Sequence, residues 1–367
     1  MNWMTLQTVI ASVSLPLMAL LPGVFVLTAR LTRPDIFFSF TVEPTLRQSA
    51  AGLAILRQFN RTVILSALAG LALTLSGAVV RFTPALGLAL IVGGMAVESA
   101  GMIAAYATAR QQVKPHQVEP SRVRELALQP RPTRPVGGWL GQVGPFLILA
   151  LAAVCLWWQW DAIPARFPVH WNWYGRPDGW AVKSARSVFG SVLLGASVCL
   201  LLGLMMNGMA RGVRRIHSRG LEGEQESRFL RRMLLLVLWL EYFMAAAFGF
   251  SPILPPRLTA VLMMTALPIA VASLVVALTC GQGGWRLKGQ APAAMPAGQA
   301  PAGDRTPDVC WKWGLFYYNP ADPALWVEKR FGIGWTVNFG NPRAWFVMGG
   351  ILLFAVAVSV ASVLLMK

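Results

Sequence analysis

The feature that most constrains this chain is a series of eight long apolar segments. A helix needs about 20 mostly apolar residues to cross the hydrocarbon of a bilayer. The segments that approach or exceed this length are 6–29, 63–81, 84–108, 143–160, 187–207, 233–250, 258–279 and 344–366. Charged residues make up only 13% of the chain, against about 25% in soluble domains. The sequence therefore predicts an all-α integral membrane protein with eight transmembrane helices.

Lysine and arginine are distributed unevenly between the predicted loops. The loops 30–62, 109–142, 208–232 and 280–343 hold 25 of the 32 basic residues. Because loops rich in lysine and arginine stay in the cytoplasm, these four loops are predicted to be cytoplasmic and both termini to lie outside. The basic residues flank apolar spans and form no single basic face, which argues against a nucleic-acid partner.

The cysteines indicate neither a disulfide framework nor a metal site. The chain has four of them, and no two are arranged as Cys-x-x-Cys. Cys155 and Cys199 lie inside apolar spans, where a thiol behaves as a small apolar side chain. We therefore expect no metal and no cofactor.

Composition divides the chain into five regions. Residues 1–142 form a region of three spans with cytoplasmic loops, and residues 143–280 form a block of four spans. Residues 281–310 form a linker whose Gly, Ala, Pro and Gln content is too simple to build a core. A small cytoplasmic module is predicted at 311–345, and residues 346–367 form the last helix.

The first candidate site is the outer loop at about 161–186, within the four-span block. Its prolines and the turn signal Pro177-Asp-Gly179 predict a compact, ordered loop. His170 is open to three interpretations. It is a catalytic or metal-binding group (a general base oriented by Asp178, or a metal ligand), a structural hydrogen-bonding group, or a ligand contact or pH-responsive group.

Three tryptophans of this loop allow two further interpretations. Trp171, Trp173 and Trp180 either rest on lipid headgroups or stack against an extracytoplasmic peptide or glycan. The candidate ligand contacts are His170, Trp171, Asn172, Trp173, Asp178 and Lys183.

The same loop resembles a known bacterial family. The string Pro164, Pro168-Val-His-Trp-Asn172, Gly175-Arg-Pro-Asp-Gly179 and Lys183 is similar to the domain of unknown function 1648. That domain is shared with immunity proteins of Sdp-type toxin systems, which protect the membrane and sense the toxin. The resemblance implies an immunity-like protein of the bacterial cytoplasmic (inner) membrane.

The second candidate site is the module at 311–345. The runs 315–318, 325–329 and 335–339 favour short strands separated by Asn-Pro, Asp-Pro and glycine signals, so we expect a β-hairpin-like unit. Its motifs, Tyr318-Asn-Pro-x-Asp-Pro, Val327-x-Lys-Arg, Gly332-x-Gly-Trp-Thr and Asn338-Phe, resemble the domain of unknown function 5808. The unit is structural or docks a cytoplasmic protein partner. The docking candidates are Tyr318, Asn319, Asp322, Lys329, Trp335 and Asn338.

The third candidate site consists of two carboxylates inside predicted spans. Glu98 lies near the middle of the third span and Glu241 near the middle of the sixth. Apart from Arg81 at the very end of the second span, no basic residue lies in any span to pair with them. An ionisable group at this depth is costly, and its usual roles are a proton or cation site or a polar substrate path. The alternative is a neutral Glu that makes an interhelical hydrogen bond. If the two share a cavity, they would share one proton.

Three functions follow from these sites. The first is a non-enzymatic envelope sensor, immunity-like protein or regulator, with a ligand outside and a partner inside. The second is a proton- or cation-coupled transporter that uses Glu98 and Glu241. The third is a membrane enzyme that acts on lipid or cell-wall material through His170 and Asp178, although the sequence has no nucleophile elbow and no zinc-binding helix.

Overall fold

The computed structural model describes residues 3–79, 83–120, 135–171, 177–214, 220–255, 266–287 and 303–365. This part of the chain is mainly helical, with several very small sheets. The α-helices are α1 (Trp3–Leu31), α2 (Ala50–Val79), α3 (Pro84–Val113), α4 (Gly138–Trp158), α5 (Ala185–Gly212), α6 (Gly220–Phe250), α8 (Ala266–Cys280) and α9 (Pro342–Leu365).

Seven helices in the described part are long and apolar enough to cross a membrane. They correspond to seven of the eight predicted spans, and the fold is that of a membrane protein. The remaining predicted span, 258–279, lies partly outside the described residues. Its described part is α8, whose apolar stretch Pro268–Cys280 is shorter than a full crossing. The eighth crossing and the outer position of both termini stay predictions.

The chain separates into two compact units, which are described one at a time. Unit 1 comprises Met1–Arg124, Gln290–Tyr317 and Glu328–Gly334. Unit 2 comprises Glu125–Gly289, Tyr318–Val327 and Trp335–Lys367. Residues 311–345 therefore alternate between the two units, while the predicted five-region division of the chain stays a prediction.

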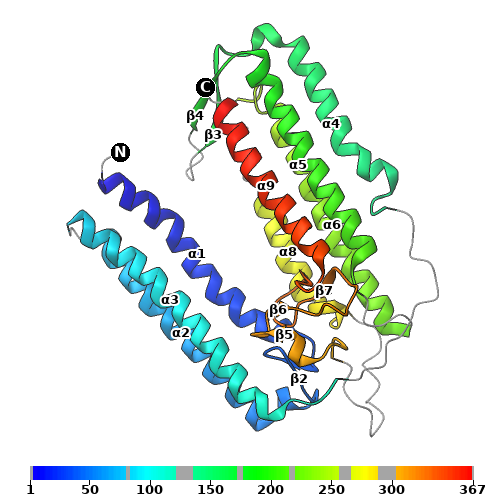
Figure 1. The fold of residues 1–367 in the computed structure, drawn as a ribbon. Coiled ribbons are helices and arrows are strands. Elements are labelled where there is room, and N and C mark those ends of the chain that lie inside the picture. Colours follow the sequence, from blue (N-terminus) through cyan, green and yellow to red (C-terminus); the bar gives the residue numbers. More distant parts are fainter. Residues whose placement is uncertain are drawn as a thin grey trace. The chain divides into compact units, whose positions relative to one another are not determined.

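Unit 1 is built on α1, α2 and α3, which pack side by side (Figure 1). Glycines let α2 and α3 approach closely: a Cβ on Gly70 would lie 2.6 Å from the Gly94 carbonyl oxygen, and one on Gly77 would lie 2.5 Å from that of Gly87. Small residues at such contacts allow the van der Waals packing that holds helices together in lipid. At one end of the three helices, Phe38, Phe59 and Tyr106 form an aromatic core.

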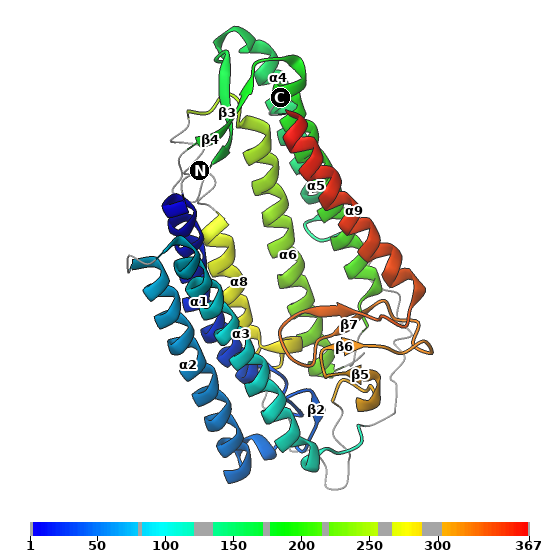
Figure 2. The same ribbon diagram turned by 60° about the vertical axis from the view of Figure 1, so that its left-hand side comes forward.

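Unit 2 contains α4, α5, α6, α8 and α9, and α5 and α6 lie side by side over much of their length (Figure 2). Its core has two parts along α5. One part includes Leu156, Phe167 and Val188. The other includes Met206, Leu230 and Leu234, with Trp326 and Trp335 packed against it.

The strands form four separate two-stranded sheets, each made of strands consecutive in the chain. They are β1 (Ile36–Phe37) with β2 (Phe40–Thr41), β3 (Arg166–Trp171) with β4 (Pro177–Val182), β5 (Trp311–Lys312) with β6 (Phe316–Tyr317), and β7 (Trp326–Glu328) with β8 (Trp335–Val337). The last four strands lie within the extended runs predicted at 315–318, 325–329 and 335–339, or just before them. Each of the three predicted runs contains a short strand, and β5 is a further strand that was not predicted.

Candidate functional site

The loop predicted to face outward is a β-hairpin of unit 2. Strands β3 and β4 are antiparallel, with Phe167 opposite Ala181 and His170 opposite Gly179. The register is irregular on either side of His170, and such bulges re-aim side chains. The side chains of His170, Trp171 and Asp178, and all of residues 172–176 with Asn172 and Trp173, lie outside the described part. The general-base, metal and ligand-contact hypotheses for this loop stay predictions.

Lys183, at the base of the hairpin, is used in local packing. Its Nζ lies 5.1 Å from the centroid of the Trp160 ring, a cation–π geometry. Trp160 in turn stacks on Phe189 of α5 at 6.2 Å. The Lys183 backbone N–H donates to the Ala165 carbonyl at 2.9 Å. Lys183 therefore links the hairpin to the helices beside it.

The junction between the hairpin and α5 is rigid. Ser184 and Ser187 form a capping box, in which each side chain bonds the other residue's backbone N–H at the start of α5. The Ser187 hydroxyl also donates to the Val182 carbonyl, the last residue of β4, at 2.6 Å. Phe167 and Ala181 from the two strands are buried against Val188 of α5. The hairpin is therefore hydrogen-bonded to, and packed on, the start of α5.

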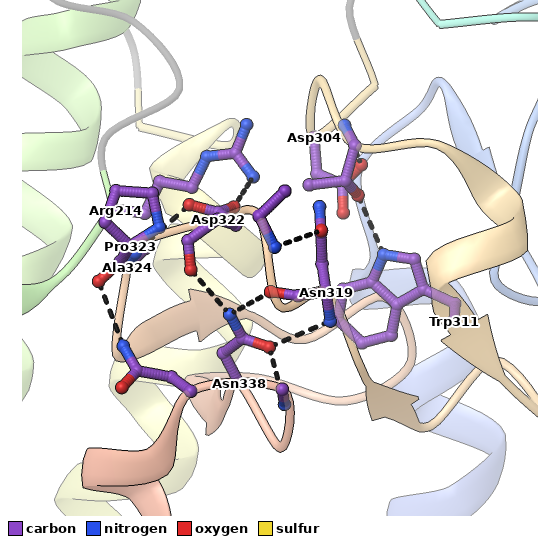
Figure 3. Close-up of polar contacts among 12 residues, drawn as sticks. Arg214, Asp304, Trp311, Asn319, Asp322, Pro323, Ala324 and Asn338 are labelled. Carbon is purple, nitrogen blue, oxygen red and sulfur yellow. Dashed lines mark hydrogen bonds and ion pairs between the residues drawn. The ribbon is translucent and has the colours of Figure 1, made fainter.

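In the second predicted site, Asn338 is the centre of a turn. Its amide nitrogen donates to the Asn319 and Asp322 carbonyl oxygens, both at 2.9 Å. Its Oδ1 accepts from the backbone N–H groups of Asn319 and Gly340, both at 3.0 Å (Figure 3). Asn338 is fully buried, and all four bonds of its amide are made. The geometry gives Asn338 a structural task within this unit.

Asp322 connects this turn to the end of α5. Its Oδ1 accepts from the Ala324 backbone N–H at 3.1 Å, and its Oδ2 lies 2.8 Å from Nη1 of Arg214 (Figure 3). Both side chains of the ion pair are largely buried. Arg214 also donates its backbone N–H to the Trp326 carbonyl at 2.9 Å. Residues 318–327 are therefore held at the end of α5 opposite to the hairpin.

The other docking candidates have separate surroundings. The Trp335 ring packs 5.2 Å from the Phe229 ring in unit 2. Lys329 belongs to unit 1, where its backbone N–H donates to the Gly334 carbonyl at 3.1 Å. Tyr318 is 49% exposed, so among these side chains it is the one that solvent or a partner reaches most easily.

A buried ion cluster in unit 1 was not anticipated from the sequence. Arg330 is fully buried and bonds Asp304 through two nitrogens, at 2.9 and 2.7 Å. It also pairs with Asp308 and donates to the Ser39 and Thr306 carbonyls at 3.0 and 2.6 Å. Asp304 and Asp308 lie in the predicted linker. The sequence did contain an indication of this cluster, because the charged residues at 304–308 interrupt the Gly, Ala and Pro composition of the predicted linker.

The electrostatics of this cluster favour the ionised forms. Burial opposes ionisation of Asp304, but the charge of Arg330 and hydrogen bonds from Arg330 and Thr306 outweigh it. They hold the pKa of Asp304 below its ordinary value. Burial likewise opposes the charge on Arg330, yet Asp304 and Asp308 raise the pKa of the guanidinium above its ordinary value. The cluster is therefore a stable ionic clamp at neutral pH.

The two intramembrane carboxylates are buried in different units. Glu98 of α3 is 2% exposed and belongs to unit 1; Glu241 of α6 is 1% exposed and belongs to unit 2. In each, the Oε2 atom is buried and has no hydrogen-bond partner within the described residues. Whether the two share one proton stays a prediction.

Glu98 and Glu241 each lie against a glycine of the neighbouring helix. The Cβ of Glu98 would lie 3.0 Å from a Cβ on Gly70 of α2. The Oε1 of Glu241 would lie 3.5 Å from a Cβ on Gly203 of α5. Along α5, the Asn207 amide donates to the Gly203 carbonyl at 2.8 Å and to Gln142 of α4 at 2.9 Å. Polar groups of three helices thus meet near Glu241.

No metal centre is evident in the described part of the chain. Within those residues no group of three or more His, Cys, Asp or Glu side chains could hold a metal ion. A cavity of about 670 Å³ lies in unit 2 and is lined by Leu140, Leu238, Tyr242, Phe243, Ile269 and neighbouring residues. Its lining is mainly apolar, and it does not include Glu241.

Comparison with known families matches two short stretches of the chain. Residues 146–195 match the family described as "Domain of unknown function (DUF1648)", and residues 320–345 match the "Family of unknown function (DUF5808)". Both resemblances predicted from the motifs are confirmed. Searches of curated proteins and of solved structures gave no match. The first match covers most of α4, the β3–β4 hairpin and the start of α5; the second includes Asp322 and Asn338.

Proposed function

We propose that this chain is a non-enzymatic protein of the bacterial inner membrane that senses or regulates events in the cell envelope. In this proposal the β3–β4 hairpin meets a ligand outside the membrane, and residues 318–345 report to a partner in the cytoplasm. The observation that carries it is a continuous contact path in unit 2, which joins the two family-matched segments through α5.

The path has the length that such a role requires. Helix α5 has 28 residues, and at 1.5 Å per residue it is about 42 Å long. A bilayer measures about 40–45 Å with its headgroups. One helix therefore reaches from the hairpin, bonded through Ser187, to the turn of Asp322, bonded through Arg214.

Both ends of the path are tight enough to transmit a displacement. At the hairpin end, the capping box and the buried Phe167 fix the strands on α5. At the other end, Val213 forms a parallel bridge with Trp326, and a Cβ on Gly212 would lie 3.2 Å from the Trp326 ring. Packed interfaces of this kind shift between discrete arrangements and do not deform gradually.

Coupling along α5 is testable without knowledge of the ligand. Arg214→Gln removes the ion pair with Asp322, and amide hydrogen exchange is then followed in the hairpin, residues 166–182. We expect faster exchange in the hairpin as well as at 318–327. The matched control is Arg228→Gln, because Arg228 forms an exposed ion pair with Glu224 within α6.

The result decides for or against the proposal. Faster hairpin exchange in Arg214→Gln alone supports coupling through α5. Unchanged hairpin exchange, in a variant whose exchange at 318–327 has increased, shows that the two segments are independent and contradicts the proposed reporting path.

A second candidate function is proton- or cation-coupled transport. It is favoured by the buried Oε2 atoms of Glu98 and Glu241, which lack partners among the described residues, because unpaired carboxylates in spans commonly mark ion pathways. Flux in proteoliposomes should then fall in Glu98→Gln and Glu241→Gln. Flux that is equal in the wild type and both variants would remove this candidate.

A further inference from the structure

The β5–β6 hairpin of unit 1 exposes a group of apolar side chains at its tip. Trp313 is 78% exposed, Phe316 45% and Leu315 39%. The Trp313 and Phe316 rings meet edge to face, 6.4 Å apart. Lys312, beside them, is exposed as well. Adjacent exposed aromatic and apolar side chains of this kind mark an interaction surface.

The tip is fixed to the end of α3. The Tyr106 hydroxyl donates to the Trp313 carbonyl at 3.1 Å and lies 2.8 Å from the Ser39 hydroxyl. The next residue, Gly314, packs closely against the Tyr106 hydroxyl, since a Cβ on Gly314 would lie 2.6 Å from that hydroxyl. The level of Tyr106 relative to the bilayer therefore sets the level of the tip.

Tyr106 lies at the level of a membrane boundary. Helices α2 and α3 are antiparallel neighbours, with Gly101 against Ser66 and Gln112 bonded to Gln58 at 2.8 Å. Counting along the antiparallel helices from these two contacts places Tyr106 of α3 opposite residues 61–64 of α2. Arg61 is the last charged residue before α2 becomes continuously uncharged to its end. Tyr106 and Arg61 thus mark the depth of the headgroups, where tyrosine and arginine are stable.

The backbone of Trp313, at the tip, adopts a left-handed conformation that is unfavourable for tryptophan. Trp313 has φ +54°, a region that bulky residues rarely adopt and that costs about 1 kcal/mol or more. Glycine or asparagine would occupy this position at lower cost. The tryptophan side chain at this position therefore does not serve the stability of the turn, which leaves it available for a contact outside the protein.

We propose that the tip formed by Trp313, Leu315 and Phe316 is a membrane anchor that lies in the headgroup interface, on the side of the membrane where residues 30–62 lie. Tryptophan and phenylalanine supply apolar area at a depth where tryptophan is preferred. Lys312 supplies a positive charge for lipid phosphates. The anchor adds a lipid contact to unit 1 beyond its spanning helices and is independent of the role proposed for α5.

Photo-crosslinking in lipid nanodiscs tests the anchor on the full chain. Benzoylphenylalanine is placed at position 316, where it replaces one aromatic side chain with another, and lipid adducts are counted by mass spectrometry. The positive control is position 103, a 69% exposed site on the spanning part of α3. The negative control is position 224, an exposed acidic site at the start of α6.

The anchor predicts a lipid adduct at position 316 at least about threefold above that at position 224, as expected for an interfacial aromatic. Adduct at the level of position 224 would overturn it, as would crosslinks from position 316 mainly to protein. The latter result would assign the tip to a protein partner.

A second variant separates anchoring from folding. Trp313→Asn suits the left-handed backbone, so the protein should melt at the same temperature or higher in detergent. Lipid adduct at position 316 should nevertheless fall by about half or more, because a large interfacial side chain is lost. Unchanged adduct in this folded variant would show that Trp313 does not hold the tip in the interface and would contradict the proposal.

Discussion

Polar groups are buried in two different ways in this protein. The Arg330 cluster of unit 1 and the Asn338 turn of unit 2 are outside the apolar helices. Most of their buried polar atoms are hydrogen-bonded, and Asp308, whose Oδ2 accepts no hydrogen bond within the described residues, is paired with Arg330. Glu98 and Glu241, in the middle of apolar helices, are just as deeply buried but keep an oxygen without a partner in the described residues.

The difference follows from what each burial achieves. An unpaired buried charge costs several kcal/mol, so each carboxylate of a cluster that only has to hold a fold is paired with a cation, as Asp304 and Asp308 are paired with Arg330. A carboxylate that must gain and lose a proton or cation is hindered by permanent partners. The contrast therefore separates groups that stabilise the fold from groups that are candidates for function, and four experiments probe it.

The largest effect is expected from Arg330→Met. The variant leaves Asp304 buried without its main partner, which should cost about 3–5 kcal/mol of unfolding free energy. Denaturant unfolding of the detergent-solubilised protein measures it. The matched control, Arg228→Met, breaks an ion pair whose side chains are both 56% exposed and should change little. Equal stability of the two variants would contradict the clamp.

The second largest loss of unfolding free energy is expected from Asn338→Ala. This substitution removes four hydrogen bonds of the turn, two to backbone N–H groups and two to carbonyl oxygens, at a cost of about 2–4 kcal/mol. The control is Asn341→Ala, since Asn341 is more exposed and its side chain makes one bond to Pro323 and one to the start of α9. A larger loss in the control than in Asn338→Ala would show that the turn is not centred on Asn338.

The third experiment is the pH dependence of the clamp. The folded pKa of Asp304 is lowered, whereas its unfolded value is about 3.9. Its contribution to stability is therefore complete above about pH 4 and is lost as the pH falls through the lower folded value. The difference in melting temperature between the wild type and Asp304→Asn should be constant from about pH 5 to 8 and shrink below about pH 4. A difference that shrinks as the pH rises would contradict this assignment.

The smallest effect on stability is expected from Glu241→Gln. The substitution preserves shape, and no hydrogen bond to Oε2 is lost, so stability should change by less than about 1 kcal/mol. The melting temperature of Glu241→Gln is compared with those of the wild type and of Glu98→Gln. A loss comparable with that of Asn338→Ala would place Glu241 among the structural groups and would weaken the transport candidate.

Local sequence patterns predicted the elements that depend on local chemistry. The apolar segments became helices because each contains its own backbone hydrogen bonds and needs only an apolar surrounding. The span predicted at 84–108 begins at Pro84, and Pro84 is the first residue of α3. The extended runs near 316, 326 and 335 became strands between glycine, proline and asparagine signals.

Contacts between distant residues were not predictable in this way. Arg214 and Asp322 are 108 residues apart, and Arg330 and Ser39 are 291 apart. Nothing near Asp322 in the sequence indicates its cation. Lys329 was singled out from its motif, yet its neighbour Arg330 is the residue on which the clamp depends. Which of the two neighbouring side chains, Lys329 or Arg330, is buried in the cluster depends on how the chain packs, and the motif does not indicate it.

The sequence by itself determined that this is a membrane protein with several apolar helices and two recognisable polar segments, because length, hydropathy and turn chemistry act over a few residues. Only the tertiary structure decided that α5 joins those segments, that Arg330 clamps unit 1, and that Trp313 is presented at the level of Arg61. These contacts join residues that are far apart in the sequence. They are stabilised by burial and by electrostatic attraction between groups that come together only when the chain folds.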